Sequence, residues 1–113
     1  MVKPYVPKRG DIVWLDFDPQ SGFEQKGRRP AFAVSPEKYN AKVGLAIFCP
    51  VTSRVKGYPF EVRIFVPRSV DGAILADQVK SLDWRRRRSK FICRAPGEVL
   101  NEVLAKLQIL IAG

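Results

Sequence analysis

The segment SGFEQKGRRPAF, residues 21–32, gathers side chains that could do acid–base or phosphate chemistry. It holds Glu24, Arg28 and Arg29 among two glycines and a proline, and apolar strand-like residues flank it on both sides. The chain contains no histidine, so it lacks the side chain that most often acts as general acid, general base or metal ligand. Any catalysis must therefore use carboxylates, guanidinium or ammonium groups, hydroxyls or backbone amides.

The charge balance indicates a polyanionic partner. The chain has 20 lysines and arginines against 11 aspartates and glutamates, which gives a formal net charge of +9. Such an excess in a small domain is typical of proteins that bind nucleic acid. An acidic protein is the second candidate partner. A membrane surface ranks third, because the sequence shows no basic amphipathic helix.

The sequence shows neither a metal-ligand pattern nor a membrane segment. Cys49 and Cys93 lie in apolar strand-like segments with no CxxC spacing, so we expect buried thiols rather than a zinc site. No apolar run is long enough to span a bilayer. Residues 1–11 lack the apolar block of a signal peptide. We therefore expect a cytoplasmic protein with no metal or other cofactor.

The elements that must position these side chains are mostly strands. The 113 residues are expected to form one domain, residues 1–113, with a sizeable core. The strand at 11–17 is apolar on both faces and is expected to be central. Asp71-Gly72 is a turn signal, and residues 35–44 and 52–59 are polar connections. β-branched and aromatic residues predict strands at 11–17, 30–35, 45–51, 60–66, 73–76 and 79–82 (one bent strand or two), and 91–94.

The last segment has a helical pattern instead. Pro96 suits a first helical position, and Glu98 suits the positive end of the helix dipole. One face of this helix collects Leu100, Val103, Leu104, Leu107 and Ile111. The chain is therefore predicted to be a compact, mostly antiparallel β domain closed by a C-terminal helix. A small barrel would hide the sheet edges.

Three motifs in order resemble the MazF/PemK/Kid toxins of toxin–antitoxin pairs: GDIVWLDFDPQSGFEQKGRRPAFAVSP, PVTSRVKGYPFEV and DGAILADQVKSLDW. The resemblance runs from about Tyr5 to Ile111. It implies a small SH3-like antiparallel β-barrel with a C-terminal α-helix that forms a homodimer. It also implies an endoribonuclease, independent of ribosome and metal, that cuts single-stranded mRNA at a short, ACA-like motif. Such toxins inhibit translation and growth until a cognate acidic, MazE-like antitoxin neutralises them.

The resemblance assigns catalysis to Glu24, Arg29 and Thr52. When the 2′-hydroxyl of RNA attacks the adjacent phosphorus, one proton must be removed, another supplied, and charge on the phosphate oxygens stabilised. Arg29 can donate to two phosphate oxygens at once, and Thr52 can add a hydroxyl donor. Glu24 either takes the 2′-proton or orients Arg29 by pairing with it. The products would be 2′,3′-cyclic phosphate and 5′-hydroxyl ends.

Further residues are expected to contact RNA. Phe23 and Tyr58 could stack on splayed bases, and the pair Asp77-Gln78 resembles the base-contacting pair of the family. The basic run at residues 85–90 could guide RNA through its phosphates or attract an acidic antitoxin tail. The expected RNA-binding residues are Phe23, Gln25, Lys26, Arg28, Ser53, Lys56, Tyr58, Asp77, Gln78, Arg85 and Arg86.

Other interpretations of the same residues remain open. A Glu–Arg pair on a loop is commonly a solvated ion pair of little energetic value, and a threonine at a strand end commonly caps a turn. Two alternative functions fit the same fold. One is a non-enzymatic toxin of the gyrase-poisoning kind, whose key residues lie at the C-terminal tail. The other is an SH3-like module that binds RNA without cutting it.

Overall fold

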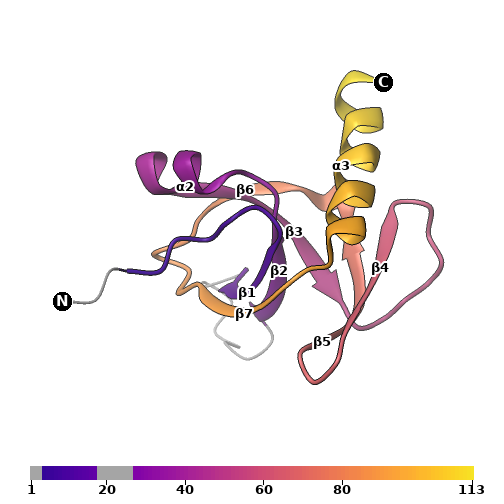
Figure 1. Ribbon diagram of the computed structural model, residues 1–113, viewed down its shortest axis with the longest axis horizontal. Helices are drawn as coiled ribbons and strands as arrows, with labels where there is room; N and C mark the ends of the chain where they lie inside the picture. The colour runs from indigo at the N-terminus through magenta and orange to yellow at the C-terminus, as the bar shows by residue number, and fades with distance from the viewer. Residues whose placement is uncertain (1–3, 18–26) are drawn as a thin grey trace.

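A curled antiparallel sheet with one long helix beside it dominates the computed structural model, which describes residues 4–17 and 27–113 (Figure 1). Two short helical segments join the strands. In chain order the elements of the described residues are β1 (Asp11–Asp16), β2 (Arg28–Ala33), α2 (Glu37–Val43), β3 (Leu45–Thr52), β4 (Glu61–Val66), β5 (Val70–Leu75), the 3-10 helix η1 (Ala76–Gln78), β6 (Lys80–Asp83), β7 (Lys90–Arg94) and α3 (Gly97–Ala112).

Strand β3 is the centre of the sheet. The strand order is β4-β5-β3-β2-β1-β7, and β6 also pairs with β3. The first half of β3 pairs with β6, from Leu45 to Phe48, whereas its last two residues pair with β5. Strand β2 occupies the opposite edge. The sheet curls into a half-barrel, with β5 and β6 paired in succession along the same edge of β3 (Figure 1). The mostly β fold with a C-terminal helix was predicted and is confirmed.

Two apolar clusters fill the two sides of the curled sheet. The first lies between the sheet and α3, which contributes Val99, Val103 and Leu107. The second cluster lies on the other side, around Phe48 and Trp84. Strand β1 contributes to both, with Ile12 in one cluster and Val13 and Leu15 in the other, as expected for a central strand.

The buried face of helix α3 was predicted for the most part, because Val103 and Leu107 are buried and Leu100 and Leu104 pack against the same cluster. Val99, missed from the sequence, is buried, whereas Ile111 is 77% exposed. The last turn of α3 extends away from the sheet, and its apolar side chains at 109–111 are exposed (Figure 1). In the described part of the chain, no helix is both long and apolar enough to cross a membrane.

The segment predicted as a polar connection at 35–44 contains helix α2, so that prediction was wrong. Buried Asn40 organises it: Nδ2 donates to the carbonyls of Pro7 and Ser35, and Oδ1 accepts from the Ser35 hydroxyl. Trp84 Nε1 donates to the Asn40 carbonyl. Two of these partners, Pro7 and Trp84, are distant along the chain, which explains why the local sequence pattern did not reveal the helix.

The turn predicted at Asp71-Gly72 is also wrong. Both residues lie inside β5, and the β4–β5 turn uses residues 67–69 instead, with Arg68 in the left-handed region at φ 65°. A Cβ on Gly72 would overlap the backbone carbonyl oxygen of Thr52. Glycine therefore lets β5 approach the end of β3. The strands at 73–76 and 79–82 are two separate strands, β5 and β6, divided by η1.

Replacing Gly72 should test this close approach. Gly72→Ala should lower the free energy of unfolding by about 1–3 kcal/mol, because an inserted methyl group overpacks the β3–β5 contact. Chemical denaturation followed by circular dichroism measures the change.

Gly97→Ala is the matched control, since a Cβ on Gly97 has open space around it. In the first turn of α3 that change should be neutral or stabilise by up to about 1 kcal/mol. Equal stabilities of Gly72→Ala and the unmodified protein would show that β5 does not need glycine there.

Candidate functional site

The pairing of β2 with β3 brings Arg29 and Thr52 together. Ala31 pairs with Pro50 in the antiparallel ladder, so the same register continued by two residues puts Arg29 opposite Thr52. Side chains of directly paired residues lie on the same face of a sheet. The ladder therefore aligns a guanidinium and a hydroxyl at one end of these two strands.

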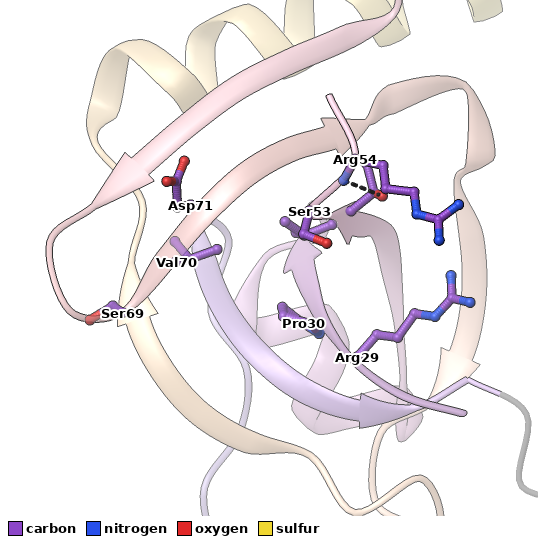
Figure 2. A pocket seen from close by; sticks show the side chains of 9 residues that line it. Arg29, Pro30, Ser53, Arg54, Ser69, Val70 and Asp71 are labelled. Atoms are coloured by element: carbon purple, nitrogen blue, oxygen red, sulfur yellow. Dashed lines mark hydrogen bonds between the residues drawn. The ribbon is translucent and has the colours of Figure 1, made fainter. Parts of the chain in front are cut away.

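A cavity of about 690 Å³ opens beside this pair. We call it the Arg29 cavity. Figure 2 shows the side chains of Arg29 and Arg54 reaching into the same opening, with Asp71 and Ser69 on the other side. Its lining residues are Arg29, Pro30, Val51, Thr52, Ser53, Arg54, Ser69, Val70 and Asp71.

A second cavity of about 470 Å³ adjoins the first. We call it the Tyr58 cavity. The two cavities share Thr52 and Arg54, so these residues lie at the junction of a two-lobed groove. The remaining lining residues of the second cavity are Lys56, Gly57, Tyr58, Glu61, Leu75, Asp77 and Gln78.

A backbone contact holds the hydroxyl oxygen of Thr52 in place. The backbone N–H of Arg54 donates to Thr52 Oγ1 at 3.1 Å (Figure 2). With a lone pair of this oxygen engaged, the hydroxyl hydrogen remains available to donate to a group in the cavity. This turn-forming contact matches the structural role considered for Thr52, and it is compatible with a functional role because it leaves the donor available.

Arg28 points to a different place from Arg29, because successive strand residues face opposite sides. Its Nη1 lies 2.9 Å from Asp16 Oδ1, and its Nη2 donates to the carbonyl of Arg88. Arg88 Nε lies 2.7 Å from the other Asp16 oxygen. Arg88 and then Arg28 lower the pKa of Asp16 through these hydrogen bonds. Arg28 therefore ties the start of β2 to the end of β1.

The basic run at residues 85–90 is only partly open to a ligand. Arg87 donates to the carbonyls of Asp16 and Phe17, so it joins Arg88 in holding this turn against β1. Arg85 and Arg86 are exposed, and the guanidinium of Arg85 lies 4.9 Å from the ring centre of Trp84. Lys90 is exposed as well, and Arg88 is exposed although it pairs with Asp16.

Tyr58 and Asp77 form a polar pair in the Tyr58 cavity. Tyr58 OH donates to Asp77 Oδ2 at 2.5 Å, and this hydrogen bond raises the pKa of Tyr58. Asp77 Oδ1 is buried without a hydrogen-bond partner among the described residues. Gln78 and Lys56 are exposed at the same cavity. The expected RNA-contacting residues of the second and third motifs thus share one lobe, except for Ser53, which lines the first.

Four predicted residues, Phe23, Glu24, Gln25 and Lys26, lie outside the described residues. The described residues contain no group of three or more cysteines and carboxylates suited to hold a metal ion.

The cysteines are both free thiols. Cys49 is buried as predicted, and burial, followed by the nearby charge of Asp77, raises its pKa to about 12. Cys93 is half-buried rather than buried.

Sequence reasoning missed three polar residues of the Arg29 cavity: Arg54, Ser69 and Asp71. Arg54 lies in a loop two residues after Thr52. Only its positive charge and this short spacing could have predicted that it lines the same cavity as Thr52. Ser69 and Asp71 reach the cavity from the β4–β5 hairpin. They are far along the chain from Arg29, so no local sequence pattern predicts that they lie near it.

Comparison with known proteins places the whole chain in one group. Residues 8–111 match the family described as the PemK-like, MazF-like toxin of type II toxin–antitoxin systems. The endoribonuclease toxin MazF of Escherichia coli K12 is 47% identical over 111 residues, covering 98% of this chain and 99% of that protein.

Solved structures agree with this match. The crystal structure of MazF from Deinococcus radiodurans superposes with a TM-score of 0.87 at 53% identity, covering 97% of this chain and 100% of that one. A MazE–MazF structure from the same organism gives a TM-score of 0.85 at 49% identity, covering 96% of this chain and 97% of that chain.

The Asp16 cluster generates a prediction about acid stability. Because the pKa of Asp16 is depressed in the folded protein, its stabilising contribution is full above the ordinary value of 3.8 and is lost as the pH falls below it. Asp16→Asn should therefore lower the melting temperature at pH 7, and the difference from the unmodified protein should shrink below about pH 4.

Thermal unfolding at several pH values measures this difference. Glu102→Gln serves as the control, since Glu102 is exposed and lies 4.0 Å from Lys106 on the same helix. A difference for Asp16→Asn that stays constant from pH 7 to pH 3 would show that charge on Asp16 does not contribute.

Proposed function

Because the chain belongs to the PemK-like, MazF-like toxins of type II toxin–antitoxin systems and is an endoribonuclease, we propose that it cuts single-stranded mRNA at a short motif. The reacting phosphodiester would lie in the Arg29 cavity. One observation carries this proposal. The β2–β3 register, continued by two residues, puts Arg29 and Thr52 at the same end of the two strands, and both residues line the Arg29 cavity.

The proposed reaction is attack of the 2′-oxygen on the adjacent phosphorus. The new bond joins O2′ to phosphorus and the bond to O5′ breaks, which leaves a 2′,3′-cyclic phosphate and a 5′-hydroxyl. Arg29 donates to a non-bridging oxygen as charge builds up there, and Thr52 adds its O–H. By family resemblance Glu24 takes the 2′-proton or orients Arg29. The same resemblance suggests that no metal ion takes part.

The Tyr58 cavity would read the neighbouring base. The ring of Tyr58, the amide of Gln78 and the carboxylate of Asp77 are the kinds of group that recognise splayed single-stranded bases. Tyr58 is 46% exposed and can stack, and Gln78 can hydrogen-bond a base edge. Lys56 can contact a phosphate at the rim. An ACA-like cleavage motif remains the proposal for the sequence that this lobe selects.

The partner that controls the activity is a cognate antitoxin. Structures of MazE–MazF from Deinococcus radiodurans support such a complex. We propose that a disordered acidic tail covers the cleft of a toxin homodimer, drawn by the net charge of +9. Exposed Arg85 and Arg86 could contact either this tail or RNA. The toxin would act in the cytoplasm, where its mRNA substrate is found.

Replacing Arg29 should separate catalysis from folding. Arg29→Ala should lower kcat by about 10²–10³-fold, the usual cost of removing one preorganised donor to a developing oxyanion. The side chain is exposed, so the fold should survive. Cleavage of a synthetic single-stranded RNA in the presence of a chelator measures the rate, and end analysis identifies the cyclic phosphate and the 5′-hydroxyl.

Three outcomes would contradict this mechanism. A requirement for Mg²⁺ would exclude the metal-independent reaction, and undiminished cleavage by Arg29→Ala would remove Arg29 from it. RNA that binds but stays intact would favour the RNA-binding module. A gyrase supercoiling assay tests the remaining alternative, in which the protein would inhibit gyrase and leave RNA uncut.

A further inference from the structure

Arg54 and Arg29 converge on one opening, and no carboxylate of residues 4–17 and 27–113 forms an ion pair with either of them. Both side chains extend into the Arg29 cavity, from the end of β3 and the start of β2 (Figure 2). Both residues are exposed. Two like charges that face one space repel each other, and an anion bound between them offsets this repulsion by attracting both.

The carboxylates around the two cavities have other partners. Asp71 lies 2.7 Å from Arg63, on the strand next to it. Glu61 accepts from the backbone N–H groups of Lys56 and Gly57, which fixes it against its own loop. Asp77 accepts from Tyr58. Each acid of the described groove thus has a partner for at least one carboxylate oxygen, whereas neither arginine has an ion-pair partner among the described carboxylates and both can bind an external anion.

Arg54 is also coupled to Thr52 through its backbone. Its N–H fixes Thr52 Oγ1, so the same residue orients the hydroxyl donor and contributes a guanidinium. Arg54 and Thr52 are the residues common to both lobes of the groove. An anion at this junction would meet Arg29 from one strand, and Thr52 and Arg54 from the end of the other.

We propose that Arg54 is a further catalytic residue, a second guanidinium that donates to the non-bridging oxygens of the reacting phosphodiester. This rests on the proposed function, because it assigns a role in the same cleavage step. When O2′ attacks, negative charge grows on two non-bridging oxygens. Arg29 and Arg54 can each donate to one of them, and each stabilises the transition state more than the singly charged ground state.

The kinetic test compares Arg54→Gln and Arg54→Lys with Lys42→Gln, which removes one positive charge from α2, outside both cavities. The substrate is a short RNA whose phosphates are neutral methylphosphonates except at the cleaved bond. Arg54→Gln should lower kcat by about 10²-fold with little change in KM. Arg54→Lys should recover part of the rate, because it keeps the charge but loses the planar fork. Lys42→Gln should match the unmodified protein.

Two kinetic results would overturn the role of Arg54. An unchanged kcat in Arg54→Gln would exclude contact with the reacting phosphate. A loss seen on ordinary RNA but absent on the neutral-flank substrate would place Arg54 on a neighbouring phosphate instead.

A second measurement is independent of cleavage. Inorganic phosphate is titrated into ¹⁵N-labelled protein while the Nε–H signals of Arg29 and Arg54 are followed by NMR. Both signals should shift with one saturation curve, and Arg54→Gln should weaken phosphate binding at Arg29 several-fold. A shift of Arg29 alone would overturn the proposal. If the unmodified protein cuts no RNA, the proposed function fails, and this titration still decides whether the two arginines share an anion.

Discussion

Antiparallel pairing of β2 with β3 is the constraint on which the site depends. Its register, continued by two residues past the Ala31–Pro50 pair, puts Arg29 opposite Thr52. The other edge of β3 must then be held in place, and β5 does this by pairing with Val51 and Thr52. Gly72 allows that approach, because any side chain would meet the Thr52 carbonyl. The groove thus lies where β2, β3 and β5 meet.

Two groups of arginines have different roles. Arg28, Arg63, Arg88 and Arg94 are paired with aspartates and fasten strands and turns together. Arg29 and Arg54 have no such partner among the described carboxylates, and both face the cavity. The net charge alone indicated a polyanionic partner. Its distribution supports the proposal that the partner's phosphate is held in the Arg29 cavity, which a count of charges alone could not suggest.

The sequence predicted the strands, the C-terminal helix and the pair Arg29–Thr52 because each depends on a local pattern or a family motif. It missed α2 because the contacts of Asn40 are to residues far along the chain. The Asp71-Gly72 pair was wrongly predicted to form a turn, because glycine is needed there for the close approach of β5 to the Thr52 carbonyl. Arg54 was overlooked among charged loop residues, and only the folded chain shows that it joins two cavities.

The most direct test of this account is a crystal structure of the protein with a single-stranded RNA that carries a 2′-deoxy nucleotide at the cleaved position. The account predicts that the phosphate following that nucleotide lies within hydrogen-bond distance of the Arg29 guanidinium and the Thr52 hydroxyl. A phosphate bound instead along the turn at residues 84–88, with the Arg29 cavity empty, would contradict it.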